Sequence, residues 1–209
     1  MRIETESWQG LINQLVTLFG RGYFAYHLTQ YPEKKRAKWP KIDAKLVQKY
    51  ALDGSIHQRY RLRKKGFCTY AIVRWEAVCV ILKTQGKPMV TEDDKFNELI
   101  KRPLAIRISD NIILEIQRVE DKVTARLSKR DFEGFEEWLV RLAGAGQIKE
   151  ARKVFDRLNG LPGFHGINQQ KWRLWSRVVA TCKRAGISPG ERPRINTRRK
   201  VVQVYKPQG

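Results

Sequence analysis

Hydrophobic residues at helical spacing are the first pattern in the chain. Between Ser7 and Phe19, large apolar side chains recur every three or four residues, which predicts an amphipathic helix. Its apolar face consists of Trp8, Leu11, Ile12, Leu15, Leu18 and Phe19. Residues 23–31 are rich in aromatic side chains and stop at Pro32, as expected of a strand. A second helix is predicted at Pro40, because proline suits the first helical turn.

Two apolar runs in the middle of the chain predict a pair of strands at residues 67–75 and 78–83, joined at Glu76-Ala77. Thr91 is a candidate cap for a short helix over residues 93–101. Turn-forming residues then separate three further apolar stretches, which predicts a three-stranded meander. Its strands are expected at residues 104–108, 112–119 and 123–127.

Beyond residue 127 the apolar pattern becomes helical. One helix is predicted after Ser128, whose hydroxyl suits an N-cap, and two more over residues 148–158 and 168–185. The sequence therefore predicts an α+β protein with a mixed or antiparallel sheet, an additional hairpin or meander, a C-terminal helical bundle and a basic tail.

The predicted elements from residue 23 to residue 108 follow the order strand, helix, strand, strand, helix, strand. This is the split β-α-β, ferredoxin-like order, which RNA-recognition motifs share with many other proteins. Lys65-Gly66-Phe67-Cys68 resembles the start of the RNP1 octapeptide of RNA-recognition motifs. The expectation of RNA binding depends on the order of the elements and not on this run. The chain departs from the octapeptide at Thr69, Tyr70 and Ile72, and the run lies on the second predicted strand instead of the third.

Charge narrows the function further. The 209 residues include 42 Lys and Arg against 21 Asp and Glu, a formal net charge of +21. Such an excess repels itself unless a polyanion neutralises it, and nucleic acid gains affinity from the same charges through counterion release. We therefore expect an α+β nucleic-acid-binding domain at residues 1–130, a helical subdomain at 131–186 and a basic flexible tail at 187–209.

Three basic segments are the candidate binding residues, each with an aromatic neighbour that suits stacking on an unpaired base. The first consists of Lys34, Lys35, Arg36, Lys38, Trp39 and Lys41. The second consists of Arg59, Tyr60, Arg61, Arg63, Lys64 and Lys65. The third consists of Arg192, Arg194, Arg198, Arg199 and Lys200, with Tyr205 nearby. In an extended backbone, Arg59, Arg61 and Arg63 would share one face at about 6.6 to 6.8 Å spacing, close to that of successive phosphates.

Catalysis has weaker support in the sequence. A metal-independent endoribonuclease needs a base, an acid and nearby cations, and His27 or His57 with Tyr26 and Lys64 are the candidates. The glycine-rich residues 160–166 resemble the glycine-rich loop of repeat-RNA-processing endonucleases, which use related ferredoxin-like folds. No metal-ligand spacing, phosphate-binding loop or cofactor motif is present, so neither a metal nor a cofactor is expected.

Two other functions stay open. Residues 148–158 and 168–185 are candidate helices of a helix-turn-helix, which would place Lys171, Arg173 and Arg177 in a DNA groove. A scaffold that docks an acidic protein partner would use the same surplus charge. In every case we expect an intracellular, reducing compartment such as the cytoplasm and no membrane, because the three cysteines show no pairing pattern and no long apolar run occurs.

Overall fold

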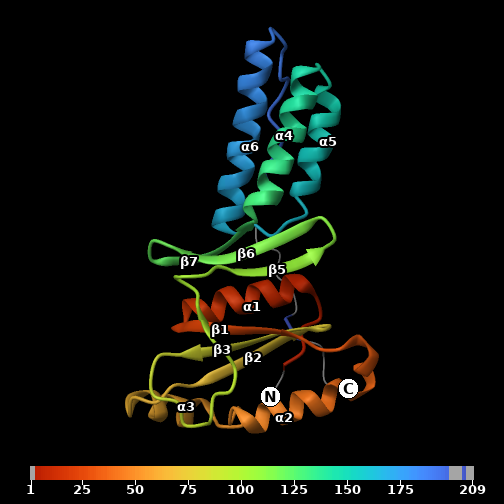
Figure 1. Ribbon diagram of the computed structural model, residues 1–209. Coiled ribbons are helices and arrows are strands. Elements are labelled where there is room, and N and C mark those ends of the chain that lie inside the picture. The colour runs from red at the N-terminus through yellow and green to blue at the C-terminus, as the bar shows by residue number, and fades with distance from the viewer. Residues whose placement is uncertain (1–2, 198–203, 206–209) are drawn as a thin grey trace. The chain divides into compact units, whose positions relative to one another are not determined.

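The computed structural model describes residues 3–197 and 204–205, and this part of the chain is α+β, with two antiparallel sheets and six α-helices (Figure 1). It forms two compact units. The first unit comprises described residues 3–104, 117–123 and 204–205, and the second comprises 105–116 and 124–197. An antiparallel sheet and a helical C-terminal region agree with the sequence prediction.

The first unit is organised around a four-stranded sheet in the order β2-β3-β1-β4. Its strands are β1 (Tyr23–Gln30), β2 (Tyr70–Trp75), β3 (Val78–Thr84) and β4 (Asn97–Glu98). Both β1 and β2 pair antiparallel with β3. Strands β1 and β2 therefore run in the same direction, with β3 between them.

Helix α1 (Trp8–Gly20) covers one face of this sheet (Figure 1). The Ser7 hydroxyl caps it by accepting a hydrogen bond from the backbone N–H of Gly10, as the sequence predicted. Its apolar stripe is buried, including Leu11, Ile12, Leu15 and Phe19 at 0% exposure. Amphipathic spacing thus fixes which side of the helix meets the strands.

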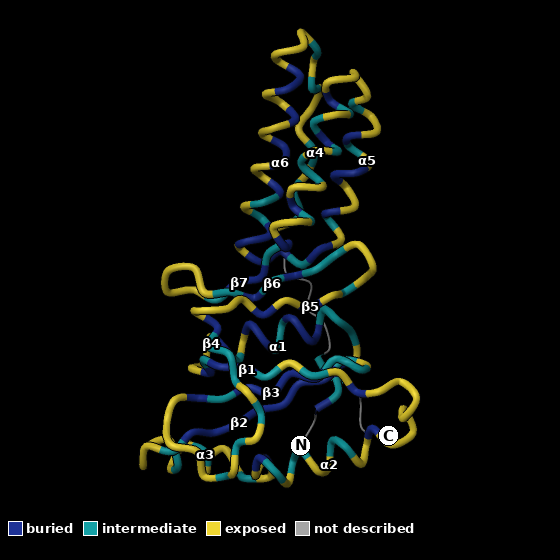
Figure 2. The backbone as a smooth tube through the Cα atoms, viewed as in Figure 1, coloured by how far each residue is buried: buried dark blue, intermediate teal, exposed yellow. Residues whose placement is uncertain are grey.

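The opposite face carries three helical segments, namely the 3-10 helix η1 (Glu33–Lys38) and the α-helices α2 (Trp39–Lys49) and α3 (Ile56–Lys64). Beneath them is a cluster of buried residues: Tyr31, Trp39, Tyr50, Leu52, Cys68, Tyr70, Ile72, Cys79 and Ile81, with Ile3 beside them. Figure 2 shows the contrast between these buried strands and the largely exposed backbone of α3. We call η1, α2 and α3 together the basic layer.

The helix predicted over residues 93–101 is wrong. This segment contains a strand and a turn: Asn97 and Glu98 form strand β4 beside β1, the N–H of Leu99 donates to the carbonyl of Phe24 at 2.8 Å, and residues 99–101 form a turn. Residues 104–108, which were expected to close the same sheet, belong to the second sheet instead. Pairing with a neighbouring strand has overridden the local helix signal at Thr91.

The three predicted strands of the meander are confirmed as β5 (Leu104–Ser109), β6 (Ile112–Val119) and β7 (Lys122–Leu127), in the order β5-β6-β7. The C-terminal helices α4 (Lys129–Gly144) and α5 (Ile148–Leu158) also match the prediction. Helix α6 (His165–Arg184) begins three residues earlier than expected. These helices and the described strand segments of the second unit share a core that includes Leu139, Phe155 and Trp175.

Residues 187–197 contain no regular helix or strand and contact the helices of the second unit. The side-chain amide of Asn159 donates to the carbonyl of Arg194 at 2.8 Å, and the N–H of Asn196 donates back to the Asn159 oxygen at 3.1 Å. In the first unit, Thr5 forms an isolated antiparallel bridge with Tyr205. Within the described ranges, none of the helices has the length and apolar character needed to cross a membrane.

Candidate nucleic-acid interface

The arginine-rich run after Ser55 is a helix and not the extended row that its alternation suggested. The backbone N–H of Gln58 donates to the Ser55 hydroxyl at 3.2 Å, and the backbone N–H of Ser55 donates to Oε1 of Gln58 at 2.6 Å. This reciprocal capping box begins α3, and most of the residues that follow are good helix formers. The predicted 6.6 to 6.8 Å pitch of guanidinium groups therefore does not exist.

Helical geometry distributes the predicted cations of α3 over two sides. Arg59 and Arg63 lie four residues apart and share a side, whereas Arg61 points elsewhere. Arg59 is half-buried, and Arg61, Arg63 and Lys64 are exposed. Tyr60 is 56% exposed, and the Lys64 ammonium lies 5.1 Å from the centre of its ring. An exposed ring beside cations is a combination found in proteins that bind single-stranded nucleic acid.

The first basic segment forms η1 and the start of α2. Lys34, Lys35, Arg36, Lys38 and Lys41 are exposed there, as the sequence predicted. They surround the start of α2 on the side of the sheet opposite α1.

Trp39 is a correction to the predicted stacking residues. It is only 4% exposed, its indole N–H donates to the carbonyl of Pro32 at 3.2 Å, and its ring lies edge-on to Tyr31. A buried indole with a satisfied donor is core, so Trp39 cannot stack on a base from solution.

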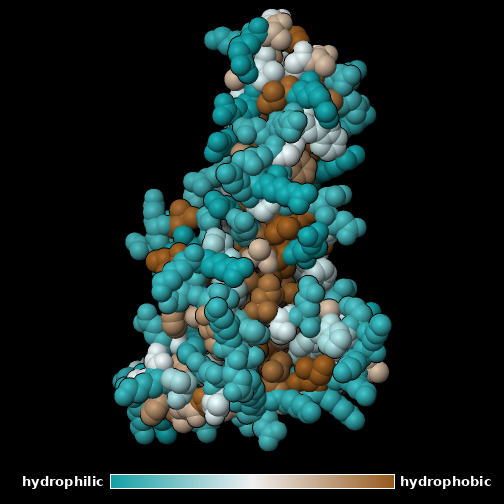
Figure 3. Space-filling view, viewed as in Figure 1, coloured by the Kyte–Doolittle hydropathy of each residue, from teal (hydrophilic) through white to brown (hydrophobic). Residues whose placement is uncertain are grey.

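Cations dominate the basic layer because few carboxylates accompany them. Residues 33–65 contain twelve Lys and Arg against three Asp and Glu. Among the described residues, the predicted cations of this layer have no carboxylate within 4 Å: Lys34, Lys35, Arg36, Lys38, Lys41, Arg59, Arg61, Arg63, Lys64 and Lys65. Hydrophilic side chains predominate along α2 and α3 on the face drawn in Figure 3.

Arg74 is a buried, structural cation that is paired with carboxylates. It is 3% exposed, and its guanidinium meets Asp43 at 3.0 Å and Glu4 at 2.8 Å. It also donates to the carbonyl of Glu76 at 2.9 Å. The buried arginine is thus fully engaged by acceptors, in contrast to the exposed cations above it.

The third basic segment is described only in part. The Arg192 guanidinium lies 3.5 Å from the centre of the exposed Trp172 ring on α6, a cation–π contact. The side chain of Arg194 is exposed. The other predicted residues of this segment, Arg198, Arg199 and Lys200, lie outside the described residues. Tyr205 is half-buried, and burial raises the pKa of its hydroxyl.

The candidate catalytic residues do not converge on one side of β1. Tyr26 and His27 are neighbours on a strand and therefore point to opposite faces. The Tyr26 hydroxyl lies on the α1 side, where it donates to the carbonyls of Arg102 and Pro103, and burial raises its pKa. His57 is exposed on the first turn of α3, and Lys64 is on the last turn of that helix.

His27 belongs instead to a polar cluster under α2 that the sequence did not reveal. Its Nε2 lies 3.7 Å from Asp94, and Asp94 accepts hydrogen bonds from Lys49 at 2.7 Å and from the Tyr50 hydroxyl. The hydrogen bond from Lys49 lowers the pKa of Asp94 despite its partial burial, and the bond to Asp94 raises the pKa of Lys49.

A second carboxylate completes this cluster. Glu92 accepts hydrogen bonds from the Tyr70 hydroxyl and from Lys83 at 2.7 Å. Burial, with a smaller effect of these hydrogen bonds, raises the pKa of both tyrosines, Tyr50 and Tyr70. The two carboxylates hold the loop between β3 and β4 against the sheet. The sequence showed Glu92 and Asp94 only as acidic residues, and their partners come from four other segments.

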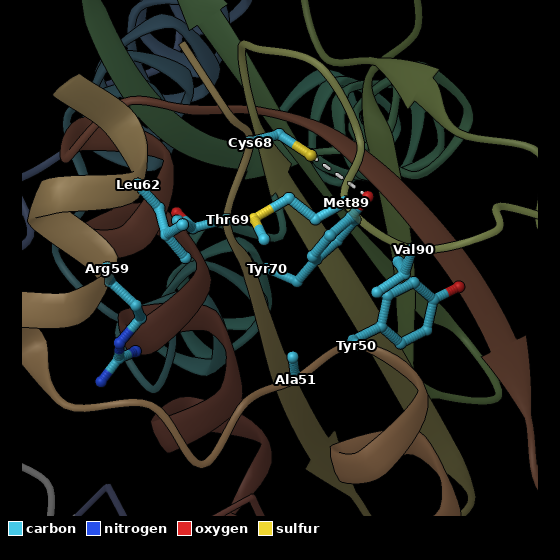
Figure 4. Close-up of a pocket in the computed structure, with 9 residues that line it drawn as sticks. All are labelled: Tyr50, Ala51, Arg59, Leu62, Cys68, Thr69, Tyr70, Met89 and Val90. Carbon is cyan, nitrogen blue, oxygen red and sulfur yellow. Dashed lines mark hydrogen bonds between the residues drawn. The ribbon is translucent and has the colours of Figure 1, made fainter. Parts of the chain in front are cut away.

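A pocket of about 130 Å³ opens beside this cluster (Figure 4). Its walls come from the end of α2, from α3, from the start of β2 and from the loop after β3, and they are mainly apolar. Arg59 lines it from α3, and its Nε is buried without a hydrogen-bond partner among the described residues. The pocket therefore connects the basic layer to the core.

The helix-turn-helix hypothesis loses one of its three contact residues. Lys171 is 1% exposed, and among the described residues its ammonium reaches only the carbonyls of Leu161 and Asn196, each at 3.4 Å. Burial lowers its pKa to about 8. Arg173 lies over the Phe132 ring, and Arg177 donates to Glu136 at 2.9 Å. A buried lysine cannot enter a DNA groove.

The glycine-rich residues 160–166 have a packing role at their C-terminal end. A Cβ on Gly166 would lie 2.8 Å from the carbonyl oxygen of Ala125, and the N–H of Gly166 donates to the Thr124 hydroxyl at 2.9 Å. Glycine is therefore needed where α6 begins against β7.

The described residues contain no cluster of three or more His, Cys, Asp or Glu side chains suited to a metal ion. Comparison of the chain with protein-family models, with curated proteins and with solved structures gave no match. The geometry of the basic layer is accordingly the basis for the functional argument.

Proposed function

We propose that this protein binds nucleic acid, RNA in preference to DNA, through the basic layer. The observation that carries the proposal is the set of cations on η1, α2 and α3 without carboxylate partners. Cations held close together repel one another, and a polyphosphate relieves that repulsion while releasing its own counterions. The exposed ring of Tyr60 offers a stacking surface in the same layer.

The preference for RNA depends on a finer interpretation of the fold. Strands β1 and β2 run in the same direction on either side of β3, and a helical segment connects them, which we interpret as a split β-α-β unit of the ferredoxin-like kind. RNA-recognition motifs use sheets of this kind, so the preference is an analogy of fold. As part of the same proposal, the protein acts in the cytoplasm within a ribonucleoprotein or a mobile-element or defence machinery.

Binding through phosphates predicts a measurable dependence on salt. Fluorescence anisotropy measures the binding of labelled single-stranded RNA, single-stranded DNA and duplex DNA of one length. A series between 50 and 200 mM salt gives the affinity for each ligand and its dependence on salt. For single strands the slope of log K against log salt is about −0.7 per neutralised phosphate. We expect a steep slope for RNA and tighter binding of RNA than of either DNA.

Two matched triple variants locate the binding surface. The first variant combines Arg61→Gln, Arg63→Gln and Lys64→Gln, and it removes three cations of α3 that have no carboxylate partner among the described residues. It should make the slope of log K against log salt less steep by about 2. The control removes the same charge from three ion-paired lysines, through Lys101→Gln, Lys129→Gln and Lys153→Gln. Equal losses in both variants would contradict a defined interface. Tighter binding of polyglutamate than of RNA would favour the acidic-partner alternative.

A further inference from the structure

We propose that the pocket beside Tyr70 holds one unstacked pyrimidine base of the bound strand. This inference rests on the proposed function and assigns a base-binding subsite to the same surface. Figure 4 shows Tyr50 and Tyr70 on one side of the pocket, Leu62 of α3 on the other, and Met89 between them. Cys68 and Val90 complete the apolar lining.

Apart from Arg59, the polar groups that line the pocket already have partners within the protein. The hydroxyl of Tyr50 donates to Asp94, that of Tyr70 donates to Glu92, and Thr69 is hydrogen-bonded to Thr84 at 3.2 Å. The lining therefore presents methyl groups, the Met89 sulfur and the edges of two largely buried rings to an occupant, since Tyr50 is 2% and Tyr70 4% exposed. It suits a flat, weakly polar group that is recognised by shape.

The volume of the pocket favours a single ring as its occupant. An apolar cavity of about 150 Å³ is known to accept one benzene molecule, and this pocket measures about 130 Å³. One six-membered ring matches that space more closely than the larger fused ring system of a purine. The discrimination expected here is therefore steric.

The charge around the pocket indicates that the ring belongs to an anion. Arg59 lines the pocket, and its guanidinium lies apart from the aromatic rings in Figure 4. Its Nε is a buried donor without a partner among the described residues, which a bound acceptor would satisfy. The exposed cations of α3 continue from the same helix. A nucleotide has both parts, a ring for the apolar pocket and a phosphate for the cations.

The test compares the homopolymers rU10 and rA10, and rU10 carrying one abasic position, at fixed salt. The variant Leu62→Phe fills the pocket, and Leu46→Phe makes the same change at a half-buried leucine of α2 outside it. Met89→Ala removes a wall at a residue that is 56% exposed, so folding should be unaffected. Thermal unfolding checks all three variants.

We expect wild type and Leu46→Phe to favour rU10, and Leu62→Phe and Met89→Ala to lose about tenfold of that preference. Because rA10 stacks on itself, the change in the rU10:rA10 ratio between wild type and Leu62→Phe is the decisive quantity. If the rU10:rA10 ratio is the same in wild type and Leu62→Phe while RNA binding still depends on salt, the base-binding role of the pocket is refuted and the proposed function stands. Absence of binding to every RNA would refute the proposed function itself.

Discussion

Ser55 and Gln58 satisfy each other's backbone N–H groups at the start of α3. Removing the hydroxyl in Ser55→Ala should destabilise the first unit by about 1 kcal/mol, because the Gln58 amide loses its acceptor. Ser55→Asn keeps a capping oxygen and should stay close to wild type. Urea unfolding measures both. Equal stabilities of the two variants would mean that this cap contributes nothing.

Loss of the buried ion pair between Arg74 and Asp43 should destabilise the protein more than loss of the Ser55 cap. Asp43→Asn leaves a 3% exposed guanidinium with Glu4 as its one charged partner in the described part of the chain, and should cost about 3 kcal/mol. Asp53→Asn is the matched control, since Asp53 is exposed and forms no ion pair among the described residues. Urea unfolding should separate the two clearly. A loss below about 0.5 kcal/mol in Asp43→Asn would contradict the assigned role.

The buried amine of Lys171 makes stability depend on pH in a predictable direction. Below about pH 8 it is charged in the folded and unfolded states alike. Between about pH 8 and its ordinary pKa of 10.5, only the unfolded chain keeps the proton, so the free energy of unfolding rises with pH. The gain is on the order of 3 kcal/mol.

Lys171→Met should remove this rise and stabilise the protein at pH 7 by about 1 to 3 kcal/mol. Urea unfolding from pH 7 to pH 10.5, taken as the difference between wild type and variant, isolates the amine from other titrating groups. Lys153→Met, at an exposed lysine, should leave the pH dependence as in wild type. If the difference in the free energy of unfolding between Lys171→Met and wild type stayed constant over this pH range, the pH dependence assigned to Lys171 would be refuted.

Two glycines of the second unit should respond oppositely to alanine. A Cβ at Gly166 meets the Ala125 carbonyl at 2.8 Å, so Gly166→Ala should destabilise by about 1 to 3 kcal/mol. A Cβ at Gly134, inside α4, meets nothing within 4 Å, so Gly134→Ala should stabilise by up to about 1 kcal/mol. Thermal unfolding of both variants checks the pair, and the same sign in both would be the contradicting result.

Hydrophobic periodicity correctly predicted the elements whose structure is determined by their own side chains. The spacing of Leu11, Ile12 and Leu15 defines α1, and the meander follows from alternating apolar residues and turns. Alternation misled at Arg59–Arg63, because the capping box and helix propensity at Ser55 decide that segment. The helix expected over residues 93–101 failed for the reverse reason, since strand pairing outside the segment fixes its backbone.

The candidate site was predictable only in its charges. Exposed cations of η1 and α3 lie where runs of Lys and Arg indicated, because solvated charges depend little on distant contacts. The pocket and the carboxylate–tyrosine cluster combine four stretches separated along the chain, so no local pattern contains them. Trp39 was misassigned because its neighbours are exposed cations while its own ring meets Tyr31.

The contact between the first and last described segments has a practical consequence for cutting the chain. The amide of Glu6 donates to the carbonyl of Val204 at 3.1 Å, and Thr5 bridges to Tyr205. The chain of the second unit is therefore inserted into that of the first unit, whose first and last described segments are hydrogen-bonded to each other. An expression fragment ending at residue 130 would remove the acceptor of the Glu6 amide, so a fragment that represents the first unit has to keep residues 204 and 205.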